Sequence, residues 1–404
     1  MRRNASISLL SVGHACVDVY QGAVAALVPY FVSERAYGYA VASGIVLAAS
    51  LLSSVAQPVF GALTDRWAMP WLLPVSTVTS GVGIALSGLG GSYGLTLVFV
   101  AVSGVGVAAY HPESARVARL ASGGSHTAMS WFSLGGNVGF ALAPLLVAVS
   151  VGQGSLRWTP VLVLPALAGA ALCVPVLRML ARSEADKAAT GTGTATGTDD
   201  LASFLRLSLA VVFRSIVFTG LSTFISLYAQ QRVHGTSAGT LALFLLFLGG
   251  AVGSLLGGAL ANRYDRVRVS AWSYLVSVAA VAGVVYVPGP AMFLFVALTS
   301  AGLYVPFSLQ VTLGQDYLPS RIGTASGVTL GLTVSIGGLA SPLLGRLADA
   351  TSLRTALTPL IAMPVLSWLL FRALPEPKAP GAPTGQMSTS SRVDAPGYGP
   401  APAP

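Results

Sequence analysis

The stretch from Gln57 to Trp71 reads Gln-Pro-Val-Phe-Gly-Ala-Leu-Thr-Asp-Arg-Trp-Ala-Met-Pro-Trp and joins one long apolar segment to the next. Its Gly-x-x-x-Asp-Arg core is formed by Gly61, Asp65 and Arg66, and it falls where the apolar segment that precedes it should leave a lipid bilayer. A related stretch, Gly-Ala-Leu-Ala-Asn-Arg at 258–263, follows about half a chain later. The two stretches together predict a duplicated protein that crosses the membrane many times.

The composition supports a membrane location. Of the 404 residues, 54% are hydrophobic and only 9% are charged, whereas a soluble domain carries about 25% charged residues. So few charges cannot cover a soluble particle of this size, and lipid must cover it instead. The net charge of +9 is explained by arginines retained on one membrane face, and we expect no nucleic-acid partner.

Twelve apolar segments are long enough to span a bilayer, which takes about 20 residues of helix. The first six cover roughly 7–32, 39–64, 71–89, 92–115, 126–150 and 157–181, and the second six cover 204–230, 237–262, 268–288, 291–316, 322–347 and 353–373. We therefore expect an all-α membrane protein with twelve transmembrane helices in two six-helix pseudo-symmetric halves. Short matches such as Tyr30 with Tyr228 and Pro144 with Pro342 recur at nearly the same offset as the loop pair.

The segments between and after the spans divide the chain. Residues 1–181 form the first half, the polar and Gly/Thr-rich segment 182–203 is a flexible cytoplasmic linker, and 204–374 form the second half. The tail 375–404 is rich in Pro, Gly, Ala and Ser, which predicts cytoplasmic disorder.

Positive charges fall unevenly on the two sides of these spans. Arg214 lies inside a span, and sixteen of the other Lys and Arg residues lie on the side of the N-terminus. The opposite side holds only Arg35, Arg157, Arg232, Arg346 and Arg354. Because cytoplasmic loops retain positive charge, we expect a multi-pass protein of the inner (plasma) membrane with both termini in the cytoplasm.

The first span carries the strongest candidate for chemistry. Ser11, His14, Asp18 and Gln21 recur at steps of three and four, which places them on one helix face. Ionisable groups at membrane depth are costly and mark bundle interiors or aqueous cavities. Asp18 can exchange a proton, and His14 can share it, which predicts proton coupling. The alternative is a structural polar pair that holds helices together.

The fourth span contains Tyr-His-Pro-Glu at 110–113, followed by Arg116. Pro112 interrupts the backbone hydrogen bonds and allows a kink. Glu113 and Arg116 are three residues apart and can pair along the helix. This pair is a candidate gate latch, a proton-coupled switch, or simple charge neutralisation. We place Glu113 with the proton-coupling residues, and His111 and Arg116 at the substrate cavity.

Other polar residues inside spans are candidates for lining a substrate cavity. Arg214 lies in the seventh span and should meet either Asp18 or an anionic ligand, because an unneutralised guanidinium is costly there. The remaining candidates, whose alternative role is helix packing, are Gln21, Asn137, Tyr304 and Ser308.

The two loop stretches predict a gate on the cytoplasmic side. A carboxylate at Asp65 can lie against the positive end of a neighbouring helix, whereas Asn262 at the matching place keeps a hydrogen bond without the charge. We expect an asymmetric latch, formed by Gly61, Asp65, Arg66, Asn262 and Arg263.

Several chemistries have no motif in the sequence. It contains no Gly-x-x-x-x-Gly-Lys-Ser/Thr loop and no His-Glu-x-x-His pair. The pattern Gly-x-Ser-x-Gly occurs at 90–94 and 235–239, but both matches fall where one apolar span follows another and not in a strand-to-helix elbow. We therefore expect no enzymatic activity, no cofactor and no metal site.

The Gly-x-x-x-Asp-Arg loop, its second copy and the twelve-span plan resemble the major facilitator superfamily. Within it, His14 with Asp18, the stretches at 57–74, 111–119 and 121–124, and Gly-Gly-Asn at 135–137 resemble the bacterial fosmidomycin-resistance-type efflux proteins. The resemblance implies proton-driven export of a small drug-like molecule, with phosphonates among the candidates, and hence drug resistance. The loop departs from the superfamily pattern at Trp67-Ala68-Met69-Pro70, and the antiporter signature of the fifth span is matched only loosely by Ala143-Pro144.

The leading prediction is therefore a proton-coupled antiporter, working as a monomer on a small-molecule substrate in the lipid bilayer. The alternative is an importer or facilitator of a small metabolite or nutrient. A membrane-embedded enzyme or a receptor fits less well, because the sequence offers no assembled catalytic motif and no folded output domain.

Overall fold

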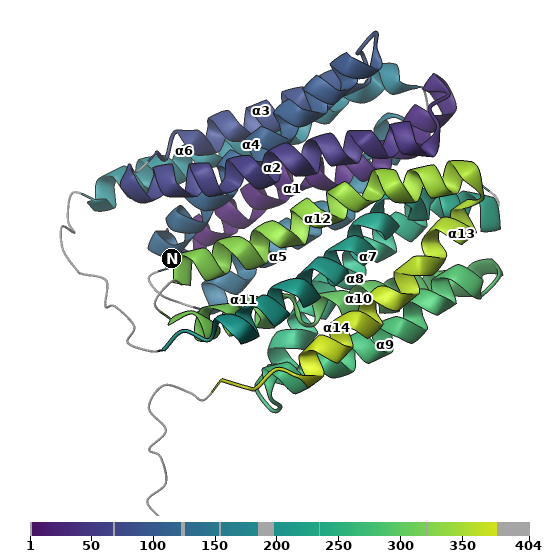
Figure 1. The fold of residues 1–404 in the computed structure, drawn as a ribbon. Helices are drawn as coiled ribbons and strands as arrows, with labels where there is room; N and C mark the ends of the chain where they lie inside the picture. Colours follow the sequence, from purple (N-terminus) through teal and green to yellow (C-terminus); the bar gives the residue numbers. More distant parts are fainter. Residues whose placement is uncertain are drawn as a thin grey trace, which may run out of the picture.

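The computed structural model is a bundle of helices that run side by side (Figure 1). It describes residues 2–67, 69–122, 126–152, 155–184, 198–233, 235–319 and 322–377. Within the helices, side chains are described except at 2–5, 58, 62, 65, 66, 119, 120, 122, 126–130, 179–184, 236, 322–324, 326, 327 and 330–335.

The first half consists of α1 (Arg2–Arg35), α2 (Tyr39–Arg66), α3 (Leu72–Ser87), α4 (Tyr93–Ser122), α5 (His126–Ser150) and α6 (Leu164–Glu184), with the 3-10 helix η1 (Leu156–Val163) leading into α6. With 34 residues, α1 is roughly 50 Å long, which exceeds the hydrocarbon thickness of a bilayer. Ser155 caps η1, since its hydroxyl accepts the N–H of Arg157.

The second half consists of α7 (Leu201–Val233), α8 (Thr236–Ala261), α9 (Arg266–Tyr286), η2 (Gly289–Ala291), α10 (Met292–Tyr304), α11 (Phe307–Tyr317), α12 (Ile322–Ala350), α13 (Leu353–Leu357), η4 (Thr358–Ile361) and α14 (Ala362–Arg372). The expected tenth span is broken between α10 and α11 at Pro306, which has no N–H to continue the helix. Asp200 caps α7 by accepting the N–H of Ser203, and hydrogen bonds from Ser203 lower the pKa of this carboxyl.

The two halves repeat the same helix packing. In the first half α1 packs on α5 and α6, α2 on α4, and α3 on α4 and α6. The corresponding pairs in the second half, α7 with α12 and α14, α8 with α10, and α9 with α10 and α14, are also in contact. Across the halves, α2 packs on α12 and α5 on α8, again a symmetric pair. The fold is therefore two pseudo-symmetric halves of six helices, as the sequence predicts.

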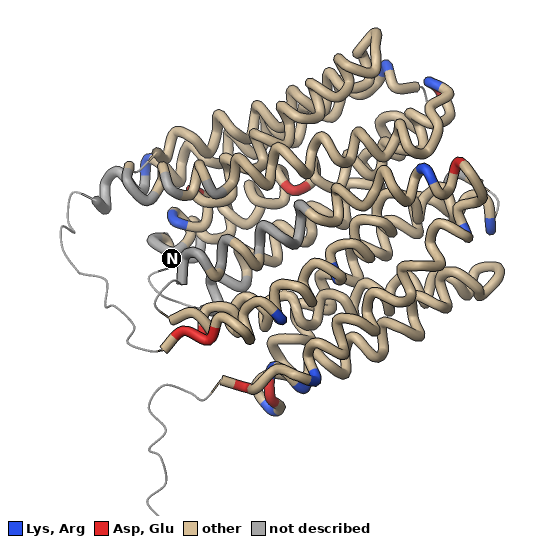
Figure 2. The backbone as a smooth tube through the Cα atoms, viewed as in Figure 1, with Lys and Arg blue, Asp and Glu red and all other residues tan. Residues whose placement is uncertain are grey.

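The length and composition of the helices suit a bilayer. Within the described residues, ten helices are long and apolar enough to cross a membrane, and α3 is a shorter apolar helix. Figure 2 shows that charged residues gather toward the two ends of the bundle, with mostly uncharged helix between them. The chain is therefore a multi-pass membrane protein.

We call the end of the bundle where α1 begins and α14 finishes the terminal end, and the other the opposite end (Figure 1). At the opposite end, the two halves are joined by Asp349 of α12. Its carboxylate oxygens accept the N–H groups of Tyr39 and Ala40 at the start of α2, at 2.8 and 3.0 Å. Gln231 of α7 donates to the Tyr39 hydroxyl at 3.0 Å. These contacts cap α2 from the other half, because the first N–H groups of a helix have no partner within it.

Removing this cap should open the opposite end more often. Replacing a helix-capping carboxylate by alanine costs about 1 kcal/mol, so Asp349→Ala should raise the open population roughly fivefold. A cysteine at Ser226, which lies near this end, would report opening by its labelling rate with an aqueous thiol reagent, after Cys16 and Cys173 are replaced by serine.

The matched control is Asp265→Ala. Asp265 precedes α9 but its side chain caps no helix N–H, so this variant should label at the parent rate. Equal labelling of the two alanine variants would show that the Asp349 cap does not hold the halves together.

Candidate functional site

A cavity of about 560 Å³ lies between the two halves. Its lining lies in the middle of the helices and extends toward the terminal end in α2, α4 and α5, where it reaches Gln57, Ala115 and Phe132. Most of the surface that the lining presents to the cavity is apolar, and its ionisable side chains are His14, Asp18, Tyr20, His111 and Tyr304. An apolar cavity with a few converging polar groups is the usual form of a small-molecule site.

Asp18 lies in the wall of this cavity between two histidines. One carboxylate oxygen of Asp18 is 3.3 Å from Nε2 of His14, one turn earlier on α1. The other oxygen is 3.1 Å from Nε2 of His111 on α4. Asp18 is 4% and His14 is 8% exposed, so water contributes little to stabilising the charges, and the three side chains must stabilise one another.

The close approach of α5 positions this cluster. The His14 ring stacks on Phe132 of α5 with centroids 4.4 Å apart, and its Nδ1 lies 3.0 Å from the Phe132 carbonyl oxygen. A methyl group added at Gly136 would lie 2.9 Å from Nε2 of His14 and closer still to the Asp18 carboxylate. Gly136 thus leaves the space that the proton-coupling candidates occupy.

Glu113 and Arg116 form the ion pair that their spacing predicts. The guanidinium Nε of Arg116 donates to a Glu113 carboxylate oxygen at 2.9 Å, and Nη2 donates to the other oxygen. Glu113 is fully buried, whereas the Arg116 side chain is 27% exposed. The pair neutralises the Glu113 charge and ties up the guanidinium, which is not in the cavity lining.

Glu113→Gln should destabilise the protein, because Arg116 would lose its carboxylate partner. We expect a loss of roughly 1–3 kcal/mol, between the values for exposed and for buried pairs, measured by thermal unfolding in detergent. The matched control is Asp265→Asn, since Asp265 forms an exposed pair with Arg268 at 3.8 Å and the same spacing. The control should change stability by less than about 0.5 kcal/mol; an equal, small loss in both variants would contradict the prediction.

Arg214 lies directly behind the cavity wall. It is 1% exposed, and its guanidinium carbon lies 5.4 and 5.2 Å from the ring centroids of Tyr304 and Phe307, both of which line the cavity. Its Nη1 donates to the Leu303 carbonyl at 3.4 Å. Among the described ion pairs both partners of Asp18 are histidines. Pairing of Arg214 with Asp18, one of the two alternatives that the sequence left open, is therefore not formed in this conformation.

The other candidates for cavity lining separate into two groups. Gln21, Asn137 and Tyr304 line the cavity together with His111. Ser308 is exposed and lies outside the lining, because the break at Pro306 ends the register that would place it beside Tyr304 in a continuous helix.

The expected gate lies at the terminal end. Asn262 follows α8, and both it and Arg263 are exposed. A methyl group added at Gly61 or at Gly258 would have no neighbour within 4 Å. The side chains of Asp65 and Arg66 are outside the described residues, so the asymmetric latch stays a prediction.

Sequence reasoning missed the aromatic part of the lining. Five phenylalanines from both halves line the cavity: Phe132, Phe140, Phe218, Phe247 and Phe307. An apolar ring inside an apolar span carries no signal in a single sequence. The association of His111 with Asp18 was also missed, although an ionisable residue at the same membrane depth could have suggested it.

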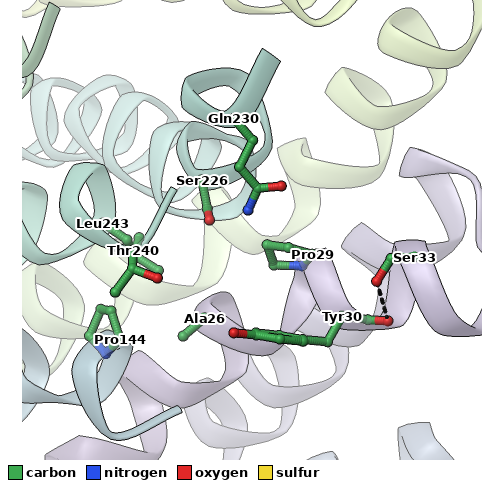
Figure 3. A pocket seen from close by; sticks show the side chains of 9 residues that line it. All are labelled: Ala26, Pro29, Tyr30, Ser33, Pro144, Ser226, Gln230, Thr240 and Leu243. Carbon is green, nitrogen blue, oxygen red and sulfur yellow. Dashed lines mark hydrogen bonds between the residues drawn. The ribbon is translucent and has the colours of Figure 1, made fainter. Parts of the chain in front are cut away.

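A second, smaller cavity of about 110 Å³ lies nearer the opposite end, and Figure 3 shows the side chains that line it. Tyr30 and Pro29 of α1, Pro144 of α5, and Ser226 and Gln230 of α7 surround it. Both halves therefore contribute to its wall.

These features define a class of protein. Two similar helical halves in a membrane, with a cavity between them that carries a few polar side chains, form the architecture of a secondary transporter. Such a transporter opens its central site to the two sides of the membrane in turn. A family model described as the Major Facilitator Superfamily matches residues 10–342. The chain belongs to this superfamily, whose members are transporters rather than enzymes, as the sequence predicts.

Relatives and solved structures agree with this assignment. The fosmidomycin resistance protein of Escherichia coli (strain K12) is 31% identical over 386 residues, covering 90% of this chain and 91% of the relative. An uncharacterized MFS-type transporter of Bacillus subtilis (strain 168), YfnC, is 31% identical over 382 residues, with the same coverage of 90% and 91%. A bacterial homologue of the human lysosomal transporter Spinster has a TM-score of 0.74 at 15% identity, over 94% of this chain and 99% of that one.

Proposed function

We propose that the protein is a proton-coupled antiporter that exports a small drug-like molecule, with phosphonates such as fosmidomycin as the first class to test. The observation that carries the proposal is Asp18, a buried carboxylate in the cavity wall between two imidazoles. A relative with 31% identity over most of the chain is named for fosmidomycin resistance, which supports export and this choice of substrate class.

Alternating access follows from the difference between the two ends. The opposite end is held by the Asp349 cap on α2, and the larger cavity extends toward the terminal end. With both termini in the cytoplasm, this conformation takes up substrate from the cytoplasm. Rocking of the halves would break the Asp349 cap and bring the gate residues at the terminal end together. We propose that one chain is sufficient for this cycle.

Proton coupling would work through the charge that the Asp18 cluster places on the cavity wall. Protonation of the Asp18 cluster removes negative charge beside the substrate, and deprotonation restores it, so proton and substrate occupancy affect each other. An anionic substrate would also be attracted by Arg214, once Tyr304 or Phe307 moves from the guanidinium.

The test is drug tolerance of an efflux-deficient bacterium that expresses the protein, with an empty vector as control at matched membrane protein levels. We expect tolerance to fosmidomycin or to another compound in a drug panel, and loss of this tolerance when a protonophore collapses the proton gradient. Greater sensitivity than the empty vector would instead support the importer. Tolerance that is independent of the proton gradient would contradict the coupling.

A further inference from the structure

The two histidines beside Asp18 use the same ring nitrogen in the same way. Nδ1 of His14 lies 3.0 Å from the carbonyl oxygen of Phe132, and Nδ1 of His111 lies 2.8 Å from that of Val107. A carbonyl oxygen only accepts hydrogen bonds, so Nδ1 carries the hydrogen in both rings. In a neutral imidazole the other nitrogen, Nε2, then has a lone pair and no hydrogen.

Both Nε2 atoms face the carboxylate of Asp18, at 3.3 Å from His14 and 3.1 Å from His111. An unprotonated Nε2 opposite a carboxylate oxygen places two lone pairs against each other in a buried site, where such a mismatch is expensive. Nε2 of His14 and one carboxylate oxygen of Asp18 are buried and have no hydrogen-bond partner in this conformation. A proton in each contact replaces the opposed lone pairs by an imidazolium beside a carboxylate, which attract each other strongly in a buried site. The short distances therefore favour two hydrogens beyond those that the Nδ1 atoms carry.

We propose that His14, Asp18 and His111 form a single store that holds two protons in this conformation, one in each imidazole–carboxylate contact. The proposal rests on the proton coupling proposed above, and adds the number of protons and the part played by His111. The loaded store contains two imidazolium ions and one carboxylate. When a proton leaves, that Nε2 has a lone pair and no hydrogen, and its ring is no longer attracted to the Asp18 carboxylate.

The position of His111 links proton loss to helix packing. His14 and Asp18 are on α1, whereas His111 is on α4, so the second proton fastens one helix to the other. Emptying that contact removes the attraction between them. Pro112, the next residue, takes one backbone hydrogen bond out of α4, so α4 has a weak point where this movement would be absorbed.

The other groups around the store do not supply the missing hydrogens. Tyr110 of α4 lies with its ring centroid 6.0 Å from those of both histidines, and the Phe132 ring of α5 is apolar. Glu113 is paired with Arg116, and the Arg214 guanidinium lies against Tyr304 and Phe307. The thiol of Cys173 lies near Gly13, and that of Cys16 lies near Gly169.

The test counts the hydrogens on each ring by nitrogen NMR. The full-length protein with His126→Gln and His234→Gln retains only His14 and His111, and it would be labelled with 15N-histidine, treated with a chelator and placed in lipid nanodiscs. At about pH 7.5, where an ordinary histidine is mostly neutral, we expect two N–H groups on each ring. Adding Asp18→Asn should remove the second hydrogen from both rings, because the carboxylate that stabilises them is gone.

Two results would overturn the proposal. A ring with a single N–H at this pH would show that the store holds fewer than two protons. Ring signals that change on chelation would show a divalent cation in place of the protons, since the three ligand atoms lie within 4.8 Å of one another. If Asp18→Asn does not fold, His111→Asn gives a second test, in which His14 should remain doubly protonated. Because no substrate is needed, a two-proton store without export would overturn only the proposed function.

Discussion

Cells that express Asp18→Asn should be no more tolerant of the exported compound than cells with the empty vector. The asparagine side chain has nearly the same shape as aspartate, but it cannot hold the negative charge that both imidazoles face at 3.1–3.3 Å. Without that charge the proton is no longer stabilised at the cavity wall, and the proton gradient has no group through which to drive transport. The measurement is drug tolerance, together with substrate-induced proton movement in proteoliposomes.

The control for Asp18→Asn is Asp265→Asn, which also exchanges a carboxylate for an amide. Asp265 is exposed, lies outside the cavity lining and caps no helix N–H, so its variant should retain export and its dependence on the proton gradient. Both proteins must reach the membrane in equal amounts and unfold at similar temperatures. Full tolerance in folded Asp18→Asn would mean that Asp18 has only a structural role, and Glu113 would become the next candidate for proton coupling.

The fold could be predicted from the sequence because its signal is repeated. Apolar runs of bilayer length, the loop pair that includes Gly61 and Gly258, and the unequal Arg distribution all require the same twelve-span plan. The pair between Glu113 and Arg116 was predictable for a similar reason, since spacing along one helix fixes which side chains meet. Asp18 and His14 followed from the same rule.

Contacts between helices could not be predicted in this way. His111 was assigned to the substrate and not to Asp18, because helix spacing says nothing about which face of α4 meets α1. Arg214 was expected to meet Asp18 or a ligand, but the aromatic rings of Tyr304 and Phe307 cover it. Ser308 was misplaced because a proline within an apolar span can either kink a helix or end it, and here α10 ends before Pro306.

Gly135 and Gly139 allow the close packing of α5 on α1 that positions the cluster around Asp18. These residues are one turn apart on α5, where α5 crosses α1. A methyl group added at Gly139 would lie 2.8 Å from Cα of Ala15, and one added at Gly135 would lie 2.9 Å from Cα of Ser11. Small residues at such spacing let membrane helices approach until their backbones touch. This approach places Phe132 and Gly136 against His14 and Asp18.

Gly139→Ala should therefore destabilise the protein by about 1–3 kcal/mol, the range for an added carbon in a filled interior. The backbone of α1 cannot rotate away as a side chain could, so α1 and α5 must separate, and the cluster around Asp18 must loosen with them. Thermal unfolding of the purified protein in detergent measures the loss. Export should fall as well, since His14 depends on α5 for its position.

Gly258→Ala is the matched control for this variant. It makes the same exchange in a membrane helix, but a methyl group there would meet nothing within 4 Å. Alanine is favoured over glycine inside a helix by roughly 1 kcal/mol, so the control should be neutral or slightly stabilising. The two variants are thus expected to change stability in opposite directions. A shift of the same sign in both would show that helix propensity, and not the α1–α5 contact, governs the effect at Gly139.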